Sequence, residues 1–118
     1  MTKIPPHYSP SVRAGNMIIT SGQLPILNRE TKEGPESIED QTRLVLKKLD
    51  NIMKEYGVTK EQIVKTTAYI TDMTYWPAVN SIYAEFFGDH KPARTVVPVT
   101  SLNFGCKIEV DAVAIIGE

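Results

Sequence analysis

Hydrophobic residues along the chain change from one period to another, and these changes predict two helices and four strands in 118 residues. Met17–Thr20 is a short β-type run that follows the turn pair Gly15-Asn16, so it predicts a strand. Residues 27–37 are polar and contain Gly34-Pro35, which predicts a loop.

A helical period begins after this loop. Ser37 is a suitable N-cap with Asp40 three residues later, and Gly57 provides the left-handed stop. The apolar stripe between them consists of Ile38, Val45, Leu49, Ile52 and Tyr56.

A strand and a second helix follow. Residues 63–71 are rich in β-branched and aromatic side chains and predict a strand. The second helix is expected to begin near Thr74, with Pro77 tolerated in its first turn, and to end at Gly88. Its apolar stripe consists of Val79, Ile82, Tyr83, Phe86 and Phe87.

The last third of the chain predicts two more strands, one containing Arg94 and one from Lys107 to Ile116, separated by a turn at residues 103–105. The order β, α, β, α, β, β predicts an α+β sandwich in which two helices cover one face of a mixed β-sheet. Val113 and Ile115 would then lie on the uncovered face, so we expect a homo-oligomer.

Charge and cysteine content exclude several functions. Thirteen basic and fourteen acidic residues give a net charge of −1, which argues against a nucleic-acid surface. Cys106 is the only cysteine, so no internal disulfide, CxxC pair or thiolate zinc site is possible. The amino terminus has no apolar signal region and no segment is long enough to cross a membrane. We therefore expect a single cytoplasmic domain, residues 1–118, without a membrane partner.

No common catalytic motif is present. His7 and His90 have no carboxylate or cysteine at metal-ligand spacing, so no metal site is expected. Singly placed polar residues remain at the ends of predicted elements: Tyr8, Ser21, Asn80, Arg94 and Glu109. Turns, caps or solvated faces explain each of them except Arg94. It stands at the entrance of an apolar strand, HKPARTVVPV, and must reach water or meet an anion.

Five strings, in order, carry a resemblance to a known family. They are GNMIITSGQLP (15–25), VKTT (64–67) with TDM (71–73), VN (79–80) with Tyr83 and Phe86-Phe87, PART (92–95), and KIEV (107–110) with AVA (112–114). Nearly the whole chain from Tyr8 onward resembles the RidA family, also called YjgF or L-PSP.

The resemblance implies a chorismate-mutase-like fold that forms a homotrimer, with active sites between subunits. It also implies hydrolysis of 2-iminopropanoate and 2-iminobutanoate, released by pyridoxal-phosphate dehydratases, to 2-keto acids and ammonia. Protonated imines are already electrophilic at carbon, so no cofactor is expected.

The same resemblance implies roles for individual residues. Arg94 corresponds to the arginine that pairs with the substrate carboxylate, and Glu109 to the glutamate that activates water. The positions that line the substrate pocket correspond to Tyr8, Ser21, Gly22, Asn80 and the backbone of Val96. Two residues depart from the usual family pattern: His7 in the amino-terminal motif, and Val96 where many members carry cysteine.

Two other functions remain open at this level. Some relatives are described as endoribonucleases or translation inhibitors, against which the near-neutral charge argues. Others bind small metabolites as sensors or act as chaperone-like modules. Binding of a carboxylate requires only Arg94, whereas hydrolysis also requires Glu109.

Overall fold

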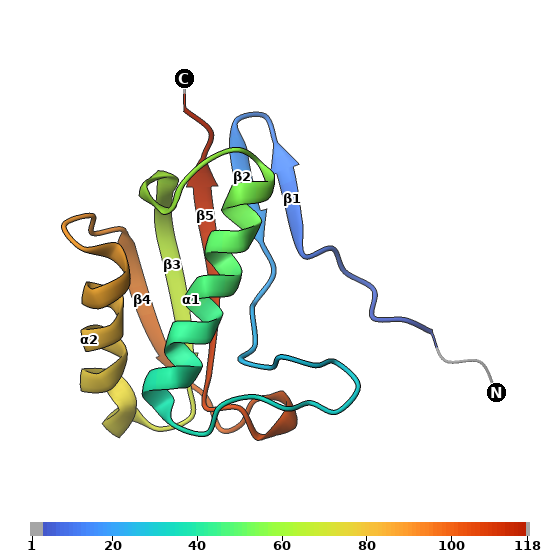
Figure 1. Ribbon diagram of the computed structural model, residues 1–118, viewed down its shortest axis with the longest axis vertical. Coiled ribbons are helices and arrows are strands. Elements are labelled where there is room, and N and C mark those ends of the chain that lie inside the picture. Colours follow the sequence, from blue (N-terminus) through green and yellow to red (C-terminus); the bar gives the residue numbers. More distant parts are fainter. Residues whose placement is uncertain (1–3, 118) are drawn as a thin grey trace.

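Two helices lie on one face of a five-stranded sheet (Figure 1). The computed structural model describes residues 4–117. The sheet order is β1-β2-β5-β3-β4. The strands are β1 (Ser11–Ala14), β2 (Met17–Thr20), β3 (Ile63–Ile70), β4 (Ala93–Pro98) and β5 (Ile108–Ile115). The helices are α1 (Ile38–Glu55) and α2 (Trp76–Phe87), with short 3₁₀ segments at Lys60–Gln62, Met73–Tyr75 and Asn103–Gly105.

The sheet is mixed, as predicted. β3 and β4 run parallel and are joined by α2, whereas β1–β2, β2–β5 and β3–β5 are antiparallel pairs. Parallel neighbours need a crossover connection, and α2 supplies it. The predicted α+β architecture with both helices on one face is therefore confirmed.

The strand β1 was not predicted, so the expected order of six elements was wrong by one. Its sequence, Ser11-Val12-Arg13-Ala14, has only one large apolar residue and lies at the edge of the sheet. It forms because Gly15, with a φ of 63°, turns the chain back onto β2. Tertiary pairing decides this strand where its own composition does not.

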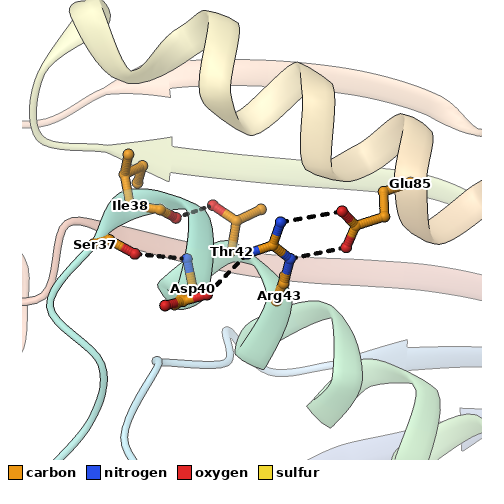
Figure 2. Close-up of polar contacts among 6 residues, drawn as sticks. All are labelled: Ser37, Ile38, Asp40, Thr42, Arg43 and Glu85. Atoms are coloured by element: carbon orange, nitrogen blue, oxygen red, sulfur yellow. Dashed lines mark hydrogen bonds and ion pairs between the residues drawn. The ribbon is translucent and has the colours of Figure 1, made fainter.

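The amino-terminal end of α1 is capped as predicted. The Asp40 backbone N–H donates to the Ser37 hydroxyl at 3.1 Å, and the Thr42 hydroxyl donates to the Ile38 carbonyl at 2.7 Å (Figure 2). Arg43 then bridges Asp40 on α1 and Glu85 on α2, with its Nε 2.8 Å from the Glu85 carboxylate. These contacts tie the two helices together at their exposed side.

The helix α2 begins close to the predicted position. The 3₁₀ segment Met73–Tyr75 leads into α2, and Pro77 occupies its first turn. The Tyr83 hydroxyl lies 2.9 Å from the Thr66 hydroxyl on β3, and both residues are buried. This buried hydrogen bond fixes α2 over the β3–β4 side of the sheet.

Successive residues of β5 face alternately the helices and the uncovered side of the sheet. Ile108, Val110, Ala112 and Ala114 are at most 1% exposed and belong to the core. Val113 and Ile115 lie on the other face, where the register places them opposite Ile19 and Met17 of β2. Ile19 is 42% exposed and Met17 is 37% exposed. The prediction of an apolar region on the uncovered face is confirmed.

Candidate active site

Arg94 lies on the helix side of β4, where its guanidinium stacks on aromatic rings of α2. Its Cζ atom is 4.3 Å from the centroid of the Trp76 ring and 4.8 Å from that of Tyr83. Its Nη2 donates to the Asn80 side-chain oxygen at 3.1 Å. Among residues 4–117, no aspartate or glutamate forms an ion pair with Arg94. The charge is held in place, but most of its N–H groups remain free to bind an anion.

The local fold explains this placement. Trp76 and Asn80 lie one turn apart on α2, so their side chains project from the same face of the helix. Thr66, whose hydroxyl binds that of Tyr83, is the register partner of Arg94. Burial raises the pKa of Tyr83 to about 12, so its ring stays neutral beneath the guanidinium at physiological pH.

Arg94 opens into a cleft of about 570 Å³ between α2 and the segment that leads into β4. Asn80, Tyr83, Ala84 and Phe87 of α2 line one wall, and residues 90–92 line the other. The side chain of Val96 packs against the core instead. Any contact of Val96 with a ligand would therefore come from its backbone.

Glu109 lies on the open face of β5, beside Gly22. A Cβ atom added to Gly22 would lie 2.4 Å from Glu109 Oε2, so only glycine leaves room for this carboxylate in its present position. Gln23 and Val110 exchange backbone hydrogen bonds of 2.8 and 3.2 Å, which hold the Gly22 segment against β5. Burial and then the charge of Asp111 raise the pKa of Glu109 above its ordinary value. A carboxylate with a raised pKa is a stronger base.

Ser21 precedes Gly22 in the chain, and its hydrogen bonds reach the segment that follows Tyr8. The Ser21 hydroxyl donates to the Ser9 carbonyl at 2.6 Å, and its backbone N–H donates to the Pro10 carbonyl at 2.9 Å. These two bonds fasten the segment that carries Tyr8, whose side chain is 56% exposed. Tyr8 therefore projects from a segment that leaves the body of the domain, as Figure 1 shows for the amino-terminal arm.

The structure divides the predicted site residues into two groups. Arg94 pairs with Thr66, and Glu109 pairs with Tyr69, three residues further along β3. Successive side chains in a strand point to opposite faces. Arg94 consequently faces the helices, whereas Glu109 faces the open side of the sheet. One copy of the chain does not bring the two charged groups into a single site.

Four residues near these groups were not among the predicted site residues. Trp76 and Tyr83 hold Arg94, and their spacing to Asn80 along the helix is a signal that sequence reasoning could have used. Tyr69 donates a hydrogen bond of 3.4 Å to Asp111, which lies on the same face as Glu109. The alternation within β5 already indicated that Glu109 and Asp111 share a face.

Within residues 4–117, no group of three or more His, Cys, Asp and Glu side chains is arranged to hold a metal ion. In the same range, no helix combines the length and the apolar character needed to span a membrane.

The fold places the chain among small α+β domains in which two helices cover one face of a mixed sheet. Residues 2–116 match the family described as Endoribonuclease L-PSP. The chain belongs to this family, the RidA/YjgF/L-PSP family, which confirms the resemblance seen in the sequence.

Individual relatives are similar over most of their length. A 2-iminobutanoate/2-iminopropanoate deaminase of Escherichia coli is 40% identical over 111 residues, covering 92% of this chain and 86% of that protein. A RutC family protein of Pyrococcus horikoshii is 37% identical over 107 residues, covering 91% and 85%. The crystal structure of E. coli TdcF with bound serine superposes with a TM-score of 0.87 and a sequence identity of 35%. The superposition covers 98% of this chain and 91% of the TdcF chain.

Proposed function

We propose that this protein is a hydrolytic deaminase that converts 2-imino acids, such as 2-iminopropanoate and 2-iminobutanoate, to 2-keto acids and ammonia. We propose further that it acts as a homotrimer whose active sites lie between subunits. One observation carries the proposal: an arginine that has no acidic partner among residues 4–117 opens into a cleft, while the carboxylate suited to act as base lies on the opposite face of the same sheet.

The chemistry of the two groups fits this reaction. A guanidinium can bind the planar carboxylate of an imino acid through two parallel hydrogen bonds. Glu109 takes a proton from water as the oxygen attacks the imine carbon, giving a carbinolamine. The carboxyl group then returns the proton to the nitrogen. As the C–N bond breaks and ammonia leaves, the regenerated Glu109 carboxylate takes the hydroxyl proton of the carbinolamine, so that the C=O bond forms, and this proton passes to the ammonia to give ammonium. Arg94 holds the substrate throughout this sequence.

The open face supplies the reason for a second copy. We define the open-face patch as the apolar residues on the uncovered side of β1, β2 and β5: Val12, Ala14, Met17, Ile19, Val113 and Ile115. A contiguous apolar patch on an exposed sheet face often marks a surface that contacts another protein. Burying the patch against a neighbouring subunit would also bring Glu109, on the same face, to the intersubunit boundary. There it could meet an Arg94 from the other subunit.

The relatives support the substrate class. Serine bound to TdcF is an α-amino acid, whose carboxylate is the group assigned here to Arg94. The E. coli relative that is 40% identical is named for the same two imines.

A coupled assay tests the activity. A dehydratase acting on threonine generates 2-iminobutanoate, and the protein is expected to accelerate loss of the imine and release of ammonia. A protein that binds 2-oxobutanoate but leaves the rate of imine loss unchanged would be a metabolite-binding module, and the deaminase proposal would be wrong.

A mixing experiment tests the shared site. Arg94→Ala and Glu109→Gln subunits are each expected to be inactive alone. If they exchange randomly into trimers, one site in each mixed trimer joins an intact arginine to an intact glutamate, which should recover about a quarter of wild-type activity. No recovery in trimers proven to be mixed would contradict a site built from two subunits.

A further inference from the structure

The cleft at Arg94 is longer than the two small imines require. Asn80, Ala84 and Gly88 follow one another at intervals of four residues along α2 and its end, so they face the same side. At 1.5 Å per residue, the eight steps from Asn80 to Gly88 extend over about 12 Å. The small side chain of Ala84 and the absence of one at Gly88 leave this length open beyond Arg94.

The opposite wall is rigid near its far end. His90 donates from Nε2 to the Ile63 carbonyl at 2.7 Å, because a carbonyl oxygen can only accept. The ring of His90 also lies edge-on to Phe87, with centroids 5.8 Å apart. These contacts fix the backbone immediately before Lys91, an exposed residue that also lines the cleft.

Lys91 provides a second positive charge in the same cleft as Arg94. Within residues 4–117, neither residue forms an ion pair, and the neighbouring Asp89 does not line the cleft. The rings of Tyr83 and Phe87, two buried residues of α2, line the same cleft. Two cations and two aromatic rings in one cleft match a ligand with an anion at each end and methylene groups between them.

We propose that this site accepts 2-imino dicarboxylates, with Arg94 binding the carboxylate next to the imine and Lys91 binding the distal carboxylate. Lys91 and Arg94 are three residues apart, so their Cα atoms lie at most about 10 Å from each other even in an extended chain. A lysine side chain and a five-carbon diacid together can bridge this distance. This inference rests on the proposed function for its chemistry. Hydrolysis proceeds as for the smaller imines, and the distal carboxylate does not react. Oxidation of an acidic amino acid at its α-carbon is the class of reaction that supplies such an imine.

Binding of two keto acids to the intact protein tests the inference. The probes are 2-oxoglutarate and 2-oxohexanoate, in which an ethyl group replaces the distal carboxylate, and affinity is measured by calorimetry. An exposed ion pair contributes about 0.2–1 kcal/mol, so 2-oxoglutarate should bind up to about five-fold more tightly. The preference should weaken as salt is added.

Substitution of the lysine provides the matched comparison. Lys91→Gln should abolish the preference, whereas Lys47→Gln, which removes an exposed charge on α1, should leave it intact. Equal binding of the two keto acids by the wild type, or a preference that survives in Lys91→Gln, would overturn the inference.

Turnover separates this inference from the proposed function. Loss of 2-iminobutanoate without any diacid preference would leave the deaminase proposal standing and remove the role of Lys91. Diacid preference in a protein that hydrolyses no imine would support the two-cation cleft and contradict the deaminase.

Discussion

The surroundings of Arg94 and Glu109 differ in how completely one chain prepares them. Arg94 is held by two rings and an amide, so its guanidinium is already oriented before any ligand arrives. Glu109 is placed by the backbone of its own strand and by the close approach of Gly22, and its carboxylate faces an uncovered side of the sheet. The guanidinium of Arg94 is organised by its own chain, whereas the carboxylate of Glu109 lies on a side of the sheet that one chain leaves uncovered.

The largest effect is expected at the base. Glu109→Gln keeps the shape of the side chain and removes its ability to take a proton, which should lower turnover by roughly 10²- to 10⁴-fold. Binding of 2-oxobutanoate should change little. Steady-state kinetics measure turnover and calorimetry measures binding of 2-oxobutanoate. Glu55→Gln, at an exposed position of α1, is the control. Full turnover in Glu109→Gln would place the base elsewhere.

The next largest effect is expected from substitution of Arg94. Arg94→Ala leaves the substrate carboxylate without a fixed partner, which costs about 2–5 kcal/mol. That corresponds to roughly thirty-fold or more in kcat/KM. Arg94→Lys should recover only part of the loss, since an ammonium group keeps the charge without the planar two-pronged geometry.

Melting temperatures separate this role from a structural one. Arg94→Ala should melt close to wild type, as should the control Arg29→Ala in an exposed loop. Early melting of Arg94→Ala with normal kcat/KM would show that the arginine only stabilises the β4–α2 edge.

A smaller effect is expected from Gly22→Ala. The added methyl group would overlap the Glu109 carboxylate, which is flexible enough to move aside. Since a displacement of about 1 Å from the reactive position can cost up to about a hundred-fold, kcat should fall by about ten-fold or more. KM and the free energy of unfolding should stay near wild type. A large loss of stability instead would indicate that Gly22 serves the fold.

The smallest change should be a shift in pH dependence. Glu109 acts in its ionised form, so activity falls as the pH drops through its pKa. The negative charge of Asp111 helps to raise that pKa, and Tyr69 donates a hydrogen bond to Asp111. Asp111→Asn should lower the pKa of Glu109 and extend activity to more acidic pH. A profile of kcat/KM against pH measures the shift, and an unmoved acid limb would contradict the coupling.

The sequence predicted the helix-covered half of the molecule well because amphipathic periods repeat there. The stripe of α1 and the alternation of β5 each extend over enough residues to determine their buried faces. β1 was missed because its four residues form a strand only by pairing with β2 in a tight hairpin. Local patterns do not report such pairing.

The face of the sheet on which Arg94 lies could not be predicted from its own strand. Val96 and Val97 are adjacent and both apolar, so the strand gives no alternation from which its inward face could be identified. The register with Thr66 and the contacts with Trp76 and Asn80 of α2 show that the guanidinium lies on the helix side. The family resemblance named Arg94 and Glu109 together, but their separation onto two faces required the three-dimensional pairing of three strands.

The ring beneath Arg94 also gives the protein an internal optical reporter. Trp76 is the only tryptophan in the chain, and its indole lies 4.3 Å from the guanidinium carbon. An anion that binds Arg94 changes the electric field on this ring, and with it the wavelength and intensity of its emission. If Arg94 binds the substrate anion as proposed, fluorescence from this single indole should report occupancy of the site without a label and without turnover.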